Sequence, residues 1–225
     1  MVYYKKNVVN DKYPFAIFLH GWGCTSSFME PLKKNIYHYN HLFIDLPGFG
    51  LSSLDSPYFI EDYVEMLEDI VTKEKIDSFY LIGHSFGGKI SLFYSLMYPN
   101  KVKGLLLIAP SIIKPFTLFT DIKIKVNKIF HKHIFKGSKD YISSSNNLRK
   151  TLVNVCRNYP PKNKIKKLKI PTYVLSFISD KEVKRKDLRK IKRINKNIHY
   201  KELNGGHFAY LSYMALIGTI MEKMI

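Results

Sequence analysis

Short apolar runs alternate with longer stretches of helical spacing along most of this chain of 225 residues. The runs are rich in β-branched and aromatic residues and are bounded by turn formers, a pattern that predicts β-strands. We expect seven strands, over residues 2–5, 15–19, 41–45, 79–82, 102–109, 173–177 and 198–203. Because strands that alternate with helices form βαβ units, the pattern predicts an α/β fold with a mostly parallel sheet flanked by helices.

Two helices are predicted with particular clarity. Apolar residues recur at helical spacing between acidic neighbours, which indicates an amphipathic helix over about 60–75. The longest window without a charged residue, 205–221, contains Gly, His, Ser and Thr and falls short of the 18 apolar residues typical of a membrane span. We therefore expect a buried C-terminal helix there.

The alternation is lost between Pro110 and Pro171, where the chain is basic with scattered aromatic residues. This interval is too long for a plain loop, so we predict an insertion of short helices, a small lid over about 111–165, in an otherwise single domain covering 1–225. Within it, 137–141 and 143–147 are rich in turn formers, and 148–156 is predicted to be helical.

The segment Gly83-His84-Ser85-Phe86-Gly87 stands between a predicted strand and a helix-like stretch. Glycines two positions either side of a serine permit a sharp strand-to-helix turn that exposes the hydroxyl, which is the geometry of a nucleophile. A plain glycine-rich loop is the alternative, because this pattern also occurs by chance. Residues elsewhere in the chain are needed to distinguish a nucleophile from a plain loop.

A serine nucleophile needs a base and an acid that orients the base. Asp180 and His207 each follow a predicted strand, and residues beyond the carboxyl ends of parallel strands meet at one edge of a sheet. The order Ser85, Asp180, His207 is also the order expected for a nucleophile on such a turn. The rivals are Glu182 and Asp187 for the acid, and His199 for the base.

An oxyanion requires backbone N–H donors, and two sources are predicted. One is the amide of Phe86, which follows the serine at the start of a helix. The other is the loop His20-Gly21-Trp22-Gly23 after the second strand, with the amide of Trp22 as donor. We expect His20 to brace this loop, and Asp45 to tie down its own turn beside Pro47-Gly48.

In these motifs the chain resembles the α/β-hydrolase fold family. His20-Gly21-Trp22-Gly23 matches its oxyanion loop, Asp45-Leu46-Pro47-Gly48-Phe49-Gly50 its D-x-P-G-x-G turn, and 83–88 its nucleophile elbow. The stretch from Ile170 to Asp180 resembles its acid-bearing strand, and Gly206-His207 its histidine turn. The chain departs from the family in having Phe177-Ile178-Ser179 where a glycine is usual, and one strand rather than two before Phe15.

The resemblance implies a serine hydrolase of carboxylic esters or related acyl compounds, with the catalytic triad Ser85, His207 and Asp180. Trp22, Phe49 and Phe208 would line an apolar acyl pocket, although aromatic residues there are equally typical of core. The same machinery serves a thioesterase, a lactonase or a carbon–carbon bond hydrolase. A ligand-binding protein that keeps the fold without turnover is a further alternative.

Positive charge is distributed unevenly along the chain. The chain has 36 Lys and Arg against 18 Asp and Glu, and residues 111–196 hold 24 of the former against 5 of the latter. This segment is predicted either to associate weakly with an anionic surface or to carry solvated lysines as a compositional habit. No nucleic-acid module is recognisable.

Further expectations concern cofactors and location. Cys24 and Cys156 stand far apart without metal-ligand spacing, so neither a disulfide framework nor a zinc site is predicted, and Cys24 is expected to be a small packed residue. The proposed chemistry requires no metal or organic cofactor. The first residues do not resemble a secretory signal, which favours a cytoplasmic protein acting on a small-molecule acyl substrate.

Overall fold

The computed structural model describes residues 1–113 and 140–225. In the second of these ranges, the side chains are described from residue 146 onward. One sheet of seven strands lies at its centre, in the order β1-β3-β2-β4-β5-β6-β7. β1 pairs antiparallel with β3, and all other neighbours are parallel. The strands are β1 (Tyr4–Asn7), β2 (Phe15–Leu19), β3 (Asn40–Ile44), β4 (Phe79–His84), β5 (Val102–Ile108), β6 (Thr172–Phe177) and β7 (His199–Leu203). The predicted α/β class is confirmed, and all seven predicted strands occur within a few residues of their expected bounds.

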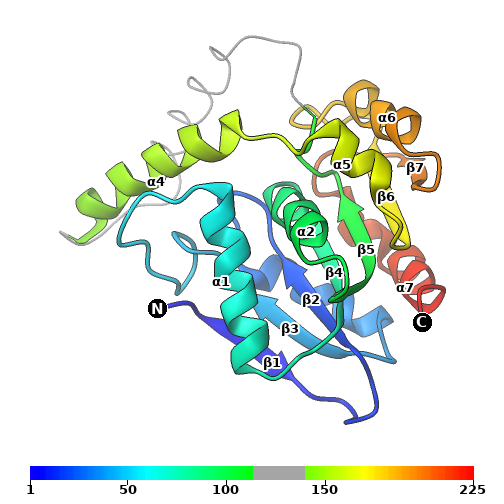
Figure 1. Cartoon of the computed structure of the whole chain (residues 1–225), viewed down its shortest axis with the longest axis horizontal. Helices are drawn as coiled ribbons and strands as arrows, with labels where there is room; N and C mark the ends of the chain where they lie inside the picture. Colours follow the sequence, from blue (N-terminus) through cyan, green and yellow to red (C-terminus); the bar gives the residue numbers. More distant parts are fainter. Residues whose placement is uncertain (114–139) are drawn as a thin grey trace.

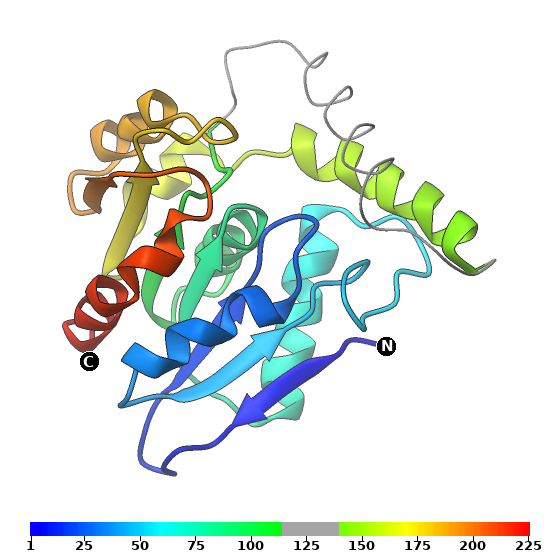
Figure 2. The same cartoon turned by 180° about the vertical axis from the view of Figure 1, so that it is seen from behind.

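Helices cover both faces of this sheet (Figures 1 and 2). One face carries α1 (Ile60–Lys73), α2 (Phe86–Met97) and α6 (Arg185–Ile194), and the other carries η2 (Glu30–Asn35), η3 (Ala209–Tyr213) and α7 (Met214–Glu222). A short η1 (Ser26–Phe28) precedes η2. The strands supply both cores by alternation: in β2, Ile17 and Leu19 face the first core, whereas Ala16 and Phe18 face the second.

The predicted helix at 60–75 is confirmed as α1, and the predicted buried C-terminal helix as η3 and α7. α1 begins in a capping arrangement, because the side chain of Asp62 accepts a hydrogen bond of 2.6 Å from the N–H of Phe59. In the part of the chain that the structure describes, no helix is long and apolar enough to cross a membrane.

Two helices occupy the described part of the predicted lid, α4 (Asp140–Arg157) and α5 (Lys162–Lys167). The prediction of a turn over 143–147 was wrong, because these residues belong to α4. Asn147 shows the physical reason, since its side-chain amide donates hydrogen bonds to the carbonyls of Leu54 and Asp55 rather than to its own backbone. Residues 114–139 of the predicted lid, including the turn formers at 137–139, lie outside the described residues.

Tertiary contacts attach α4 to the start of α1, past which it runs (Figure 1). The hydroxyl of Thr151 accepts a hydrogen bond of 2.8 Å from the N–H of Tyr58, and Asn154 donates to the carbonyl of Tyr58. Leu148 and Val155 are buried in the same core as α1. The described part of the insertion is therefore packed on the domain and shares its core.

Candidate active site

Ser85 occupies a sharp turn between β4 and α2. Its backbone has φ 51° and ψ −107°, a region that non-glycine residues rarely adopt and that costs about 1–3 kcal/mol. Hydrogen bonds hold this conformation from both sides: the N–H of Ser85 donates to the carbonyl of Ile108, and its carbonyl accepts from Ser111. The side chain is half-buried, and among the described residues its hydroxyl has no hydrogen-bond partner.

Glycines at this turn are required by close packing. A Cβ added at Gly83 would lie 2.5 Å from the carbonyl oxygen of Gly87, and one added at Gly87 would lie 2.2 Å from the carbonyl oxygen of Leu19. Neither position can hold a side chain without displacing backbone. The Gly-x-Ser-x-Gly pattern thus reflects the approach of α2 to β4 and of the elbow to the end of β2.

Asp180 and His207 lie together at the carboxyl edge of the sheet. Nδ1 of His207 lies 2.7 Å from Oδ2 of Asp180, whose side chain is fully buried, whereas the imidazole is slightly exposed. The other carboxylate oxygen, Oδ1, accepts hydrogen bonds from the N–H groups of Glu182 and Val183. The carboxylate is therefore held rigidly by its own turn while it contacts the histidine.

Of the rivals named by sequence analysis, Glu182 lies in the turn after Asp180, where its N–H donates to Oδ1 of Asp180, and the other two lie elsewhere. Asp187 is buried on α6 and accepts a hydrogen bond of 2.6 Å from Lys190. His199 is exposed on β7, where its ring stacks on that of Tyr173 at 4.5 Å. The imidazole of His207 and the carboxylate of Asp180 thus contact each other, whereas His199 and Asp187 have other partners.

His84, the residue before the serine, is a site residue that sequence analysis missed. Its Nε2 donates a hydrogen bond of 3.0 Å to the backbone carbonyl of His207, and the two rings lie 4.6 Å apart. Burial lowers the pKa of His84 to about 3, so its ring is neutral and the proton is on Nε2, facing the carbonyl. The available signal was a histidine at the last position of a buried strand.

The loop after β2 packs directly against the elbow. The N–H of Gly87 donates to the carbonyl of His20 at 3.0 Å, and a Cβ on Gly21 would lie 2.9 Å from the ring of His84 and 3.4 Å from the Cβ of Ser85. Within the described chain the backbone N–H groups of Trp22 and Phe86 donate no hydrogen bond. These two N–H groups are therefore free donors, one on the loop that contacts the elbow and one at the start of α2.

His20 braces this loop, as expected. Its Nδ1 lies 2.8 Å from the carbonyl oxygen of Gly21, and its Nε2 accepts a hydrogen bond of 2.9 Å from the N–H of Leu46. Burial lowers the pKa of His20 to about 4, which keeps the ring in this neutral tautomer. The side chain joins the loop after β2 to the turn after β3.

Asp45 ties down its own turn, also as expected. Its carboxylate accepts hydrogen bonds from the N–H groups of Ser26 and Leu51. Burial raises the pKa of this carboxyl, but the hydrogen bonds outweigh burial and leave the pKa below its ordinary value. Gly50 must be glycine here, because its φ is 57° and a Cβ would lie 2.1 Å from Oδ2 of Asp45.

Aromatic side chains surround the elbow. The ring of Trp22 meets those of Phe49 and Phe86 edge to face, at 4.9 and 5.2 Å. Phe49 and Phe86 are almost fully buried, whereas Phe208 is 45% exposed and lies 5.2 Å from the ring of His84. Of the predicted acyl-pocket residues, Trp22 and Phe49 therefore form one packed cluster, and Phe208 lies on the histidine side.

Metal-ligating and thiol groups contribute little to this site. Among the described residues no group of three or more His, Cys, Asp or Glu side chains is arranged to hold a metal ion. Cys24 is buried as expected, and burial raises the pKa of its thiol to about 11, so the thiol is protonated at neutral pH.

The comparisons with known proteins agree with this fold. Residues 16–133 match the family model described as alpha/beta hydrolase fold. A pimeloyl-[acyl-carrier protein] methyl ester esterase of Wigglesworthia glossinidia brevipalpis is 29% identical, over 93% of this chain and 92% of its own length. The esterase of the same name from Pseudoalteromonas atlantica is 33% identical over 44% of this chain, a match that covers only 38% of that relative's length.

A solved structure of a hydrolase from Pseudomonas aeruginosa shares the fold, with a TM-score of 0.80 and 13% identity over 98% of this chain and 92% of that one. The chain belongs to the α/β-hydrolase fold family. Its relatives reported above are named as hydrolases, which supports the predicted enzyme class.

Proposed function

We propose that this protein is a serine hydrolase that cleaves carboxylic esters through an acyl-enzyme. The observation that carries the proposal is the 2.7 Å contact between Nδ1 of His207 and a buried carboxylate of Asp180, next to a strained serine turn. A carboxylate in that position orients the imidazole and stabilises its protonated form. Backbone strain at a serine on a strand-to-helix turn is typical of nucleophiles held ready for attack.

The proposed reaction has two halves. His207 removes the proton from Ser85 as the hydroxyl oxygen attacks the ester carbonyl, and the amides of Trp22 and Phe86 donate hydrogen bonds to the developing oxyanion. The protonated imidazole then gives its proton to the leaving alcohol, which leaves an acyl group on Ser85. A water molecule, activated by the same histidine, releases the acid and restores the serine.

An ester is the proposed substrate class because the relative that aligns over nearly the whole chain is named as a methyl ester esterase. The described aromatic cluster of Trp22, Phe49 and Phe86 adds an apolar wall beside the serine. Such a wall suits the acyl portion of the substrate. The predicted lid over about 111–165 is proposed to complete the site.

Labelling with a fluorophosphonate probe and hydrolysis of p-nitrophenyl and methyl esters of increasing chain length test the proposal. The Ser85→Ala variant is expected to lose labelling and at least about 1,000-fold in kcat, since nucleophile removal in serine hydrolases has effects of this size or larger. Ser95→Ala is the matched control: Ser95 is buried on α2, and its hydroxyl donates a hydrogen bond to the carbonyl of Ser91. Equal labelling of Ser85→Ala and the wild type would overturn the proposal.

A further inference from the structure

Two large aromatic side chains lie exposed next to the proposed base. Phe28 and Phe208 are 44% and 45% exposed, and their ring centres lie 6.0 Å apart although the two residues are distant in the sequence. The carbonyl of Phe28 accepts a hydrogen bond of 2.9 Å from the hydroxyl of Tyr210, which holds the two segments together. Single exposed apolar residues are ordinary, whereas adjacent ones leave a shared apolar surface in water and mark contact sites.

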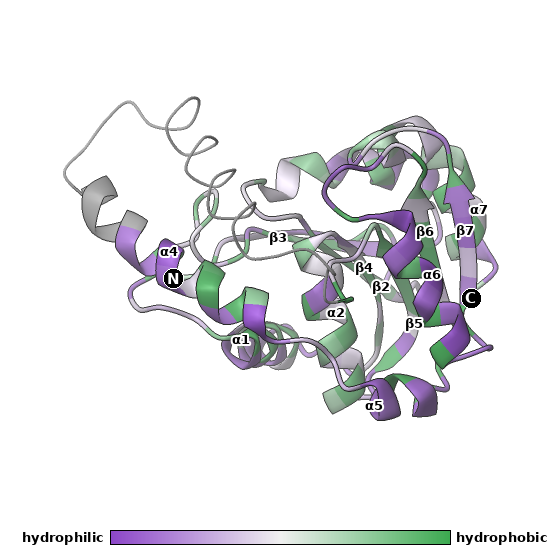
Figure 3. Cartoon of the chain, turned by 90° about the horizontal axis from the view of Figure 1, so that it is seen from above, coloured by the Kyte–Doolittle hydropathy of each residue, from purple (hydrophilic) through white to green (hydrophobic). Residues whose placement is uncertain are grey.

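Phe208 joins this pair to the proposed base. Its ring meets that of His207 edge to face at 5.4 Å and lies 5.2 Å from the ring of His84. Phe28 ends η1, which follows the loop after β2. Elsewhere on the surface, α5 and α6 are predominantly hydrophilic on their outer sides (Figure 3), as is usual for helices that face water. The apolar pair is therefore a local feature of the histidine side of the site.

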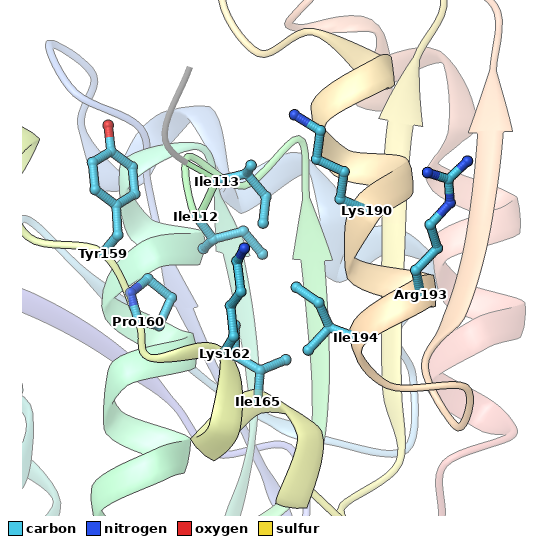
Figure 4. Close-up of a pocket in the computed structure, with 9 residues that line it drawn as sticks. All are labelled: Ile112, Ile113, Tyr159, Pro160, Lys162, Ile165, Lys190, Arg193 and Ile194. Atoms are coloured by element: carbon cyan, nitrogen blue, oxygen red, sulfur yellow. The ribbon is translucent and has the colours of Figure 1, made fainter. Parts of the chain in front are cut away.

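The acyl group of the proposed substrate has other apolar surface to contact. The aromatic cluster at the elbow is one part of it. Ile112 also lines a cavity of about 350 Å³ (Figure 4), and the preceding residue, Ser111, donates its N–H to the carbonyl of Ser85. Most of the cavity lining belongs to the predicted lid. Neither the cluster nor the cavity includes Phe28 or Phe208, so these two rings are left for another part of the substrate.

The proposed chemistry places the alcohol portion of the ester near His207. The protonated imidazole gives its proton to the leaving oxygen, so that oxygen lies within hydrogen-bond reach of the ring. The group attached to the oxygen then extends past the residues beside the imidazole. We infer that Phe28 and Phe208 bind the alcohol portion of the substrate, and that this portion is apolar and larger than a methyl group, such as a benzyl group. This inference rests on the proposed function.

Hydrolysis of methyl, propyl and benzyl butyrate tests the inference, because the acid is constant and only the alcohol changes. A methyl ester leaves both aromatic rings in water, whereas a benzyl ester covers them. The value of kcat/KM is therefore expected to rise along the series, by at least about tenfold from methyl to benzyl. The ratio is compared between variants, so that the intrinsic reactivity of each ester cancels.

Variants locate the contact. Phe28→Ala is expected to lower the benzyl-to-methyl ratio at least about threefold, and the double variant Phe28→Ala and Phe208→Ala to bring it to about twofold or less. Phe28→Leu keeps an apolar side chain and is expected to retain most of the preference. Tyr37→Ala is the matched control, since Tyr37 is 60% exposed and precedes β3 at the amino edge of the sheet.

A second ratio separates specificity from a general disturbance of the base. The ratio of kcat/KM for methyl octanoate to that for methyl butyrate reports the acyl side, and it is expected to be unchanged in Phe28→Ala. A variant that only displaces His207 lowers kcat for all esters alike and leaves both ratios unchanged. Thermal unfolding followed by circular dichroism shows that each variant is folded.

Equilibrium binding separates this inference from the proposed hydrolysis. Ser85→Ala keeps both rings, and isothermal titration calorimetry is expected to show benzyl butyrate binding it at least about tenfold more tightly than methyl butyrate. Adding Phe28→Ala and Phe208→Ala is expected to remove most of this difference. A wild type that hydrolyses no ester while this binding preference is intact would contradict the proposed function alone. Equal binding of the two esters, or a preference that survives loss of both rings, would contradict this inference.

Discussion

The ring of His84 donates a hydrogen bond of 3.0 Å from Nε2 to the backbone carbonyl of His207, across 123 positions of sequence. It joins the residue before the proposed nucleophile to the residue proposed as its base. His84 also packs against Phe208 and Tyr210, which flank the histidine turn. The elbow and the histidine turn are therefore held together by one side chain, and His84 is a positioning residue in the proposed mechanism.

Replacing His84 by Phe keeps an aromatic ring but removes the donor to the carbonyl of His207. We expect kcat for ester hydrolysis to fall about tenfold or more with little change in KM. The loss of a buried hydrogen bond costs about 1–3 kcal/mol, and here the lost bond is one that holds His207, the proposed base, in position. Steady-state kinetics with a p-nitrophenyl ester measure it. His199→Phe is the control, since His199 is exposed on β7. A change in KM alone would contradict the positioning role.

Asp180→Asn tests the acid. An asparagine keeps an oxygen that can accept from the N–H groups of Glu182 and Val183, so the turn is expected to remain folded while the charge beside His207 is lost. We expect kcat to fall about 10,000-fold, as in other triads that lose this carboxylate.

The matched control for the acid is Asp187→Asn, which removes a buried carboxylate paired with Lys190. It is expected to retain activity, with at most a modest loss of stability. Kinetics and thermal unfolding of both variants are compared. Similar losses of activity in the two variants would mean that Asp180 has no special role.

Gly87→Ala tests the close approach of the elbow to β2. The added Cβ would lie 2.2 Å from the carbonyl oxygen of Leu19 and 2.6 Å from that of His20, so backbone must move. We expect the free energy of unfolding to fall by about 1–3 kcal/mol, measured by urea denaturation. Gly206→Ala is the control, because nothing lies within 4 Å of its Cβ position. Equal stability of the two variants would show that the elbow has room.

The burial of Lys89 predicts that the stability of the protein depends on pH. It is buried on α2, its Nζ donates to the carbonyls of Val155 and Asn158, and it lies 4.2 Å from the centre of the Tyr159 ring. Burial lowers its pKa from 10.5 to about 8. The unfolded chain therefore binds more protons than the folded chain between these values, and this group makes the protein more stable as pH rises.

We expect the wild type to gain up to about 2 kcal/mol relative to Lys89→Met between about pH 8 and pH 9.5. Urea denaturation at several pH values measures the difference. Lys103→Met, at an exposed position on β5, is the control and is expected to follow the wild type. If the free energies of unfolding of the wild type and Lys89→Met change in parallel with pH, the prediction is wrong, because Lys89 then binds protons equally in the folded and unfolded states.

Much of the fold and of the candidate site could be predicted from local sequence patterns. The seven strands follow from short apolar runs between turn formers, and α1 from apolar residues at helical spacing. Ser85 is marked by its glycines, which close packing requires on either side of it. Asp180 and His207 could be named because each follows a strand in a parallel sheet, where strand ends converge. Their roles in catalysis stay predictions.

Other features depend on contacts between distant segments. The turn expected over 143–147 is helical in the structure, where Asn147 bonds to the loop before α1. The role of His84 depends on its contact with the carbonyl of His207, 123 positions further along the chain.

Local sequence patterns are enough to predict the order of strands and helices, the sharp turn at Ser85 and the polar residues at the strand ends. These depend on side-chain periodicity and backbone freedom, which act over a few residues. The orientation of His207 by Asp180, the contact between His84 and the histidine turn, and the burial of Lys89 are visible only in the folded protein. These features depend on the packing of segments that are far apart in the chain, and local sequence patterns do not predict that packing.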